Sequence, residues 1–350
     1  MNITLEEKLG QMFIIRMQGK TITEDLISLI KEYHIGGISL YSRNYDSYEE
    51  MYNLINNLKK INSKYNKTPL FIAIDQEGGR VNRLPIEFEN IPSAKKISKD
   101  NKLVEESGRI TGELLSELGI NMNFAPVLDI QRFKDNHAIG DRCFGDNKED
   151  VIEKGILMMN SLKKNLIPVV KHFPGHGLVN KDTHIFLPGI GKDITKEDDL
   201  CPFIEAIKED APAIMISHIM IRKMDKMYPA SLSKKVITDY LINELRYEGL
   251  IITDDLKMKA VNFIYGYKKS AYKAVEAGNN LILIGADYDE VKNSINYIKL
   301  KLNDSIEENI NISYDKIINT KNKYHIADEK KSVIDIDKYN KRINKIREAV

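Results

Sequence analysis

The segment from Lys171 to His184, KHFPGHGLVNKDTH, concentrates side chains that could carry out chemistry. It contains three histidines, two lysines and an aspartate. Histidine and aspartate side chains together are a donor set that zinc accepts. His172 and His176 are four residues apart, but Pro174 and Gly175 between them prevent the helix that would bring both rings to one face. The spacing therefore argues against a metal site, and we predict neither a metal nor another cofactor.

The far end of the same segment suits acid–base chemistry. Asp182 and His184 are two residues apart, so on an extended loop both side chains point the same way. A carboxylate beside an imidazole fixes the tautomer and supports the charged form of the ring. Such a pair could deliver a proton to a leaving group, which would free Asp254, two predicted strands further along, to act as a nucleophile. Gly175 and Gly177 could hinge this loop.

Short apolar runs alternate with longer amphipathic stretches along the chain. The predicted strands are 11–17, 36–42, 70–77, 122–130, 168–173, 213–220, 249–256 and 280–285. The predicted helices include 47–61, starting at Ser47, 104–118, 149–165, 289–303 and a periodic stretch from Ser233 to about residue 246. Apolar strands separated by helices indicate a parallel sheet covered on both faces. About eight such repeats favour an α/β fold with a closed (β/α)₈ TIM-type barrel, regular or somewhat irregular, over an open doubly wound sheet.

The end of the chain differs from the rest in composition. Beyond a predicted last barrel helix it is charged and rich in lysine and asparagine. We expect one main domain, the barrel at 1–305, and a helical C-terminal tail at 306–350 that packs on it.

Polar residues recur where the predicted strands end. In a barrel, the carboxyl ends of the strands and the loops after them form the active face. Charged side chains that directly follow apolar runs are costly unless they are paired or face water, so several of them together suggest one shared pocket. The residues in question are Asp75, Asp129, Lys171, His172, His218, Asp254 and Asp255.

Each of these positions also has a purely structural interpretation. Asp255 could cap the next helix, as aspartate commonly does. His218 could be a hydrogen-bonded core histidine, and Asp129 a barrel-end residue that bonds to backbone. Asp75 could belong to a solvated, salt-bridged loop.

Composition narrows the choice of partners and compartment. The net charge is +1, from 52 basic and 51 acidic residues, so no global field attracts nucleic acid or an anionic membrane. The two cysteines are too few for a disulfide framework. The amino terminus lacks the order of a signal peptide, and no apolar run approaches the roughly 20 residues of a membrane span. We therefore expect a cytoplasmic protein without nucleic-acid or membrane partners.

Several separated motifs closely resemble glycoside hydrolase family 3, in particular its single-barrel β-N-acetylglucosaminidase (NagZ-type) branch. The resemblance covers roughly residues 4–285. In chain order the motifs are LEEKLGQMF, HIGGISLYSRN, IDQEGGRVNRL, FAPVLDI, IGDRCFG, KHFPGHG followed by DTH, and ITDDLKM.

The resemblance implies a role for each matching residue. Asp254, the first acid of ITDD, matches the catalytic nucleophile, and His184 matches the general acid/base with Asp182 as its partner. His176 matches a position in the loop architecture or behind the sugar-binding groups, and His218 a position lining the pocket. The positions that hold the sugar are Asp75, Arg83, Arg142, Lys171 and His172. A histidine acid departs from the two-carboxylate scheme of most glycosidases, and its ordinary pKa of about 6.5 suits proton exchange near neutrality.

The resemblance implies a retaining exo-β-N-acetylglucosaminidase that removes terminal N-acetylglucosamine from β-linked glycosides such as peptidoglycan fragments. Its partner would be that glycoside, and we expect a monomer or a weak homo-oligomer. The same fold could instead act as a phosphorylase on β-N-acetylglucosaminides or as a β-glucosidase. A metal-dependent hydrolase and a non-catalytic sugar-binding barrel are further alternatives.

Overall fold

The computed structural model describes residues 3–133, 136, 138–179, 189–191, 194 and 198–350. Eight parallel strands form its sheet, in the order β10-β1-β2-β3-β4-β5-β7-β9. Their bounds are β1 Phe13–Arg16, β2 Gly37–Leu40, β3 Phe71–Ile74, β4 Met122–Asn123, β5 Ile167–Phe173, β7 Ala213–Ile216, β9 Leu250–Thr253 and β10 Ile282–Ile284. A separate short pair joins β6 Gly189–Ile190 and β8 Met220–Ile221.

The first and last strands in this order, β10 and β9, also contact each other. The Thr253 amide donates to the Leu281 carbonyl at 3.1 Å, and the Leu281 amide donates to the Ile251 carbonyl at 3.0 Å. This contact between β9 and the start of β10 nearly closes the sheet into a ring. The predicted TIM-type barrel is therefore confirmed, and the alternative of an open doubly wound sheet is excluded.

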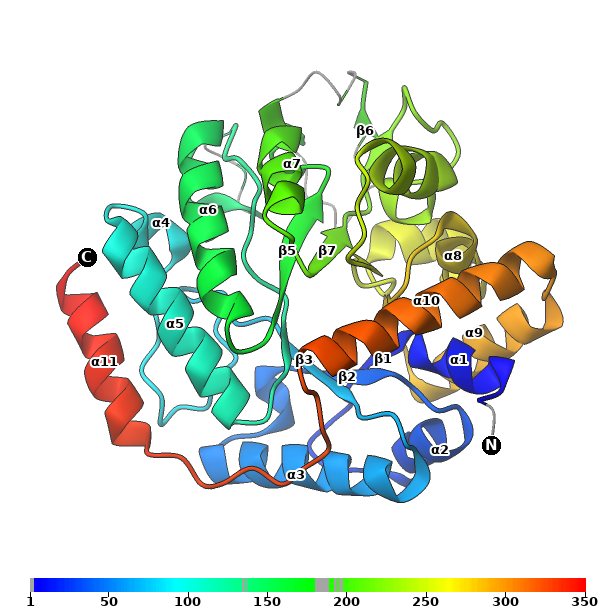
Figure 1. Cartoon of the computed structure of the whole chain (residues 1–350), viewed down its shortest axis with the longest axis horizontal. Coiled ribbons are helices and arrows are strands. Elements are labelled where there is room, and N and C mark those ends of the chain that lie inside the picture. Colours follow the sequence, from blue (N-terminus) through cyan, green and yellow to red (C-terminus); the bar gives the residue numbers. More distant parts are fainter. Residues whose placement is uncertain (1–2, 134–135, 137, 180–188, 192–193, 195–197) are drawn as a thin grey trace.

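Helices surround the strands (Figure 1). Their bounds are α1 Leu5–Gln11, α2 Glu24–Glu32, α3 Tyr48–Tyr65, α4 Ala94–Ile97, α5 Asn101–Glu117, α6 Lys148–Lys163, α7 Cys201–Lys208, the π-helix η7 Lys235–Glu244, α8 Lys259–Ala277, α9 Tyr288–Leu300, α10 Asp304–Lys323 and α11 Ile336–Glu348. The start of α3 was expected at Ser47, and the Ser47 hydroxyl accepts the Glu50 amide at 3.2 Å as its N-cap. No helix in the described part of the chain is both long enough and apolar enough to cross a membrane.

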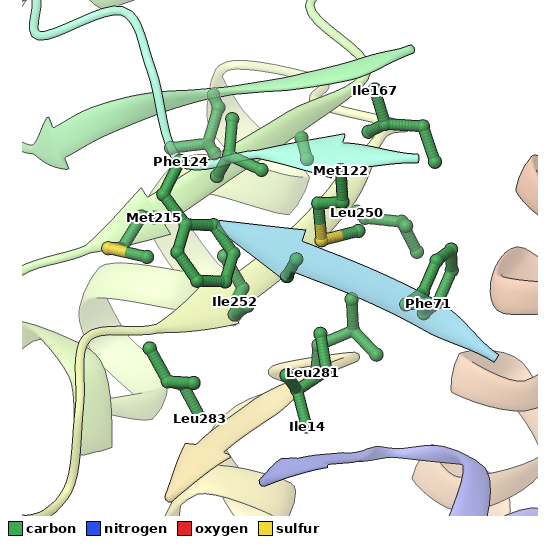
Figure 2. Close-up of a cluster of buried hydrophobic side chains, with 14 of the residues drawn as sticks. Ile14, Phe71, Met122, Phe124, Ile167, Met215, Leu250, Ile252, Leu281 and Leu283 are labelled. Carbon is green, nitrogen blue, oxygen red and sulfur yellow. The ribbon is translucent and has the colours of Figure 1, made fainter. Parts of the chain in front are cut away.

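The interior of the barrel is filled by apolar side chains, which Figure 2 shows pointing toward one another from several strands. Successive strand residues face opposite sides, so every second residue points inward. The buried side chains include Ile14, Phe71, Ile167, Leu250 and Ile252. Continuing the same alternation to the carboxyl ends of these strands turns Arg16, Asp75, Lys171 and Asp254 inward as well.

The last two helices pack against the barrel helices. Figure 1 shows α10 running across the barrel and α11 lying beside α5. Arg342 of α11 pairs with Glu113 of α5 at 2.6 Å. Lys321 of α10 is buried, and its ammonium donates to the Pro69 carbonyl at 2.7 Å and to the Gln11 side chain at 2.9 Å. These contacts hold the C-terminal segment on the fold; the expected domain boundary at residue 305 stays a prediction.

Candidate active site

A pocket of about 770 Å³ opens where the strands end at their carboxyl termini. Its floor is the upper end of the barrel core, because Phe124, Met215 and Leu283 belong to the cluster of Figure 2 and also line the pocket. Its walls are strongly polar. Six predicted site residues line it: Asp75, Arg83, Arg142, Lys171, His172 and Asp254.

Lys171 is the centre of a buried ion network. Its side chain is 2% exposed, and its ammonium lies 2.8 Å from Asp75 and 2.6 Å from Glu77. Arg142 binds the same Glu77 carboxylate through two nitrogens, each at 2.7 Å. Burial alone would raise the pKa of Glu77, but the charges of Lys171 and Arg142 outweigh it and hold that pKa far below its ordinary value. The network fixes Asp75 and Lys171 as a rigid acceptor and donor facing the pocket.

Asp254 follows β9, and its carboxylate accepts the amide of Asp255 at 2.7 Å. Burial would raise its pKa, but the neighbouring His218, His172 and Lys171 and the bond from Asp255 together lower it. An ionised carboxylate in a pocket is the form in which aspartate acts as a nucleophile.

Asp255 has a structural role that the sequence left open. Its carboxylate accepts the amides of Lys257 at 2.9 Å and Gly285 at 2.8 Å, and it pairs with Arg16 at the end of β1. It therefore connects the loop after β9 to the ends of β1 and β10, and it also makes a turn within its own loop. A Cβ on Gly285 would lie 2.6 Å from the Asp255 carboxylate and 2.9 Å from the Arg16 Nε, so a larger residue there would displace this ion pair.

His172 is oriented by Asp129, which is fully buried. The Asp129 carboxylate lies 2.7 Å from the His172 ring and accepts the backbone amide of His176 at 2.6 Å. Asp129 therefore has both a structural and a site-related role, because it bonds to the backbone of His176 and also orients the side chain of His172 in the pocket. Burial lowers the pKa of His176, which favours its neutral ring.

His218 lies beneath the pocket; it is 1% exposed and is absent from the described lining. Its ring contacts the Ser231 hydroxyl at 2.6 Å and the Asp255 carbonyl at 3.1 Å. Burial lowers its pKa. It contacts the backbone of the loop after β9 through the Asp255 carbonyl, whereas the resemblance placed it in the pocket lining.

Asp182 and His184, the expected proton-transfer pair, lie outside the described residues. The described chain stops at Val179, whose carbonyl accepts from the Asn136 side chain at 3.1 Å, and resumes at Gly189. Within the described ranges, no group of three or more histidine, cysteine, aspartate or glutamate side chains is arranged to hold a metal ion.

Two of the charged residues that the sequence prediction missed pair with predicted ones. Glu77 stands two positions after Asp75, and Arg16 two positions after inward-facing Ile14, so strand alternation could have pointed to both. The sequence does not reveal their partners, since the chain positions of Arg16 and Asp255 differ by 239.

Comparisons with known proteins agree with one another. The family model described as "Glycosyl hydrolase family 3 N terminal domain" matches residues 4–320. The chain is 31% identical over 277 residues to a beta-hexosaminidase of Methylobacillus flagellatus, which covers 76% of this chain and 78% of that protein. It is 32% identical over 287 residues to a beta-hexosaminidase of Nitrosomonas eutropha, with 79% and 81% covered.

Solved structures show the same likeness. A glycoside hydrolase family 3 beta-N-acetylglucosaminidase from Paenibacillus sp. str. FPU-7 superposes with a TM-score of 0.93 at 33% identity, covering 99% of this chain and 69% of that one. The beta-N-acetylglucosaminidase from Thermotoga maritima gives 0.78 at 26% identity, with 92% and 68% covered. The span matched by the family model includes all eight barrel strands and every pocket residue described above.

Proposed function

The chain belongs to glycoside hydrolase family 3, and from this premise we propose that it is a retaining exo-β-N-acetylglucosaminidase. Asp254 is the proposed nucleophile, and Asp182 with His184 the proposed general acid/base pair. The observation that carries the proposal is the Asp254 carboxylate, ionised in the polar pocket and oriented by the Asp255 amide.

The proposed reaction has two steps. Asp254 attacks the anomeric carbon from one face of the sugar while His184 protonates the leaving oxygen, and a glycosyl–aspartate ester forms. His184 then takes a proton from water as the water breaks that ester, so the sugar is released with its original anomeric configuration. The assignment of Asp182 and His184 rests on the DTH motif alone.

The sugar lies, in this proposal, between Asp254 and the Asp75–Lys171 pair. Asp75 accepts from ring hydroxyls and Lys171 donates to them, with Arg83, Arg142 and His172 completing the contacts. Polar groups fixed in this way discriminate against sugars that lack the matching hydroxyl, because the buried partners would be left unpaired. Names of the similar proteins support N-acetylglucosamine as the sugar. We propose peptidoglycan fragments in the cytoplasm as the source of the glycoside.

The test is hydrolysis of p-nitrophenyl β-N-acetylglucosaminide by the wild type and by Asp254→Asn. We expect kcat to fall by about 10⁴-fold or more in the variant, as for other nucleophile removals. Asp25→Asn, at an exposed carboxylate that pairs with Lys292 at 2.8 Å and does not line the pocket, is the matched control and should retain activity. Mass spectrometry after a slow 2-fluoro sugar substrate should locate the adduct on the peptide containing Asp254. Full activity of Asp254→Asn, or an adduct elsewhere, would refute the nucleophile.

The same reactions run in phosphate buffer distinguish a hydrolase from a phosphorylase. Free N-acetylglucosamine is the product expected here. Sugar 1-phosphate as the main product would overturn the assignment of water as acceptor.

A further inference from the structure

Three arginines surround one tyrosine ring in the wall of the pocket. The guanidinium carbons of Arg16, Arg43 and Arg83 lie 4.4, 4.6 and 5.7 Å from the centre of the Tyr41 ring. Arg16 is the last residue of β1, Arg43 lies in the short turn after β2, and Arg83 lies in the loop after β3, so three neighbouring strands and their loops contribute to this cluster. Arginine stacks well on aromatic faces, so the ring favours the presence of three like charges around it.

The positive charge of this cluster is only partly compensated. Arg16 pairs with Asp255, whose carboxylate also accepts two backbone amides. Arg83 makes one long side-chain bond, 3.4 Å to the Asn82 carbonyl, and Arg43 makes none with the described residues. Neither Arg43 nor Arg83 has a carboxylate within salt-bridge distance in the described part of the chain.

The cluster also leaves two buried donors unused. The Nε–H groups of Arg16 and Arg83 are buried and lack an acceptor. Buried polar groups are normally hydrogen-bonded, so donors left without an acceptor in a pocket wall suggest that a ligand supplies the acceptor. Burial and the charges of Arg16 and Arg83 lower the pKa of Arg43, which is the expected sign of cations crowded without a counter-ion.

The cluster lies beside the site of the reaction. Arg16, Tyr41 and Arg83 line the pocket, while Arg43 is exposed and stacks on the same ring outside the lining. Tyr41 is close enough to Asp75 and to Asp255 for both carboxylates to act on its phenol. The ring therefore lies near both the proposed sugar-binding carboxylate and the loop that carries the proposed nucleophile.

We propose that Arg16, Arg43 and Arg83, arranged around Tyr41, form a subsite for an anionic substituent on the sugar that is cleaved, a sulfate or phosphate ester. This deepens the proposed function and rests on it. Planar guanidinium groups bind such oxyanions through paired, charge-assisted hydrogen bonds. Arg43 and Arg83 supply the uncompensated charge, and the Arg16–Asp255 pair holds the third guanidinium in place.

The primary hydroxyl at position 6 of the sugar is the fitting attachment point. It projects from the ring, so an ester there leaves the ring hydroxyls free for Asp75 and Lys171. The volume of about 770 Å³ lies within the usual range for small-molecule pockets, about 300–1,000 Å³.

The experiment compares p-nitrophenyl β-N-acetylglucosaminide with its 6-sulfate and its 6-phosphate. We expect the wild type to have a KM for the 6-sulfate about 10-fold below that for the neutral compound, the size of one charge-assisted hydrogen bond. Arg43→Gln should raise the KM for the sulfate about 3- to 10-fold and leave the neutral substrate within about 2-fold, since Arg43 is outside the lining. Raising the salt concentration should shrink the preference, because exposed charges are screened.

Two controls separate the possible sources of an effect. Arg222→Gln makes the same charge change at an exposed arginine that follows β8, and it should leave the sulfate preference intact. The phosphate ester gains its second charge near pH 6. The preference of the enzyme for the 6-phosphate over the neutral compound should therefore grow between pH 5.5 and 7.5, relative to its preference for the 6-sulfate.

Equal KM values for the sulfate and the neutral compound would overturn the subsite while leaving the proposed function standing. An equal loss in Arg43→Gln and Arg222→Gln would also overturn it, since that result reflects only the general field of the protein. If the wild type hydrolyses none of the three compounds, the proposed function fails. Calorimetric binding of N-acetylglucosamine 6-sulfate to the wild type and Arg43→Gln then still tests the cluster, and equal affinities would refute it.

Discussion

Arg16, the last residue of β1, forms an ion pair with Asp255, the residue directly after the proposed nucleophile. The Asp255 carboxylate also accepts the amides of Lys257 and Gly285. The Asp255 amide in turn donates to the Asp254 carboxylate at 2.7 Å. An arginine on the first strand of the barrel therefore helps to fix the backbone that orients a carboxylate after β9.

Replacing Arg16 by methionine should lower kcat for the neutral substrate about 10- to 100-fold, because small displacements of a reacting group have effects of this size. KM should change less, since the variant retains Asp75 and Lys171. Arg16→Lys should recover part of kcat, because an ammonium can still pair with Asp255. Steady-state kinetics and urea unfolding measure the two effects separately. Reduced stability with an unchanged kcat would show that the pair only supports the fold.

Glu77 should contribute strongly to stability near neutral pH. Its carboxylate is paired with both Lys171 and Arg142, and Glu77→Gln leaves two buried cations with one fewer counter-charge. Removing one partner of a buried pair typically costs about 3–5 kcal/mol, so we expect a loss of this order in urea unfolding at pH 7.

The pH dependence of this loss follows from the depressed pKa of Glu77. Below its ordinary pKa of 4.5 the unfolded chain takes up a proton that the folded site resists, so the contribution is present above pH 4.5 and declines below it. The difference between wild type and Glu77→Gln should therefore shrink as the pH falls from 6 toward 3. Glu205→Gln, in an exposed pair with Lys208, should cost under about 1 kcal/mol and serves as the control. A similar cost in both variants would contradict the expectation for Glu77.

Asp129 should act on catalysis through His172. In Asp129→Asn the charge-assisted contact with the His172 ring is lost, although the amide oxygen can still accept the His176 amide. Groups that orient a functional histidine typically change activity about 10- to 100-fold, and we expect kcat/KM to fall within that range. Far-UV circular dichroism checks that the variant is folded. A folded variant with wild-type kcat/KM would mean that His172 needs no orientation by Asp129.

Strand periodicity in the sequence was sufficient to predict the barrel. All eight predicted apolar runs coincide with a strand, because strands buried on both faces need near-continuous apolar residues, and such runs can be recognised without knowing which strands pair. The bounds were less accurate: residues 122–130 yield only Met122–Asn123 as a strand, because the chain reaches Pro126, which cannot donate a ladder hydrogen bond. The run 213–220 ends its strand at Ile216 and resumes pairing only in β8.

The charged contacts were beyond prediction from the sequence. Lys171 and Asp75 are 96 positions apart in the chain, and Arg16 and Asp255 are 239 apart. Which acid pairs with which cation depends on how the strand ends are arranged around the barrel. The local pattern of apolar residues does not reveal this arrangement. Strand-end charge identified many of the pocket residues, whereas the three-dimensional structure was needed to find the partners of Asp255, which are Arg16 and the amides of Lys257 and Gly285.

Lys321 should make stability depend on pH in the alkaline range. It is buried near residues that precede β1, β2 and β3, and it donates to Gln11, to the Gly36 carbonyl and to the Pro69 carbonyl. Burial lowers its pKa from 10.5 to about 7. Between these values the unfolded chain holds a proton that the folded protein has released, so the free energy of unfolding rises with pH. Lys321→Met lacks this titrating group, so the stability of the wild type relative to the variant should increase from pH 6.5 to pH 9.5 in urea unfolding.

The control is Lys102→Met, at an exposed position on α5, which should show no such trend relative to the wild type. If the Lys321→Met and wild-type curves run parallel across this range, the ammonium stays charged in the folded protein, and its three acceptors outweigh the effect of burial.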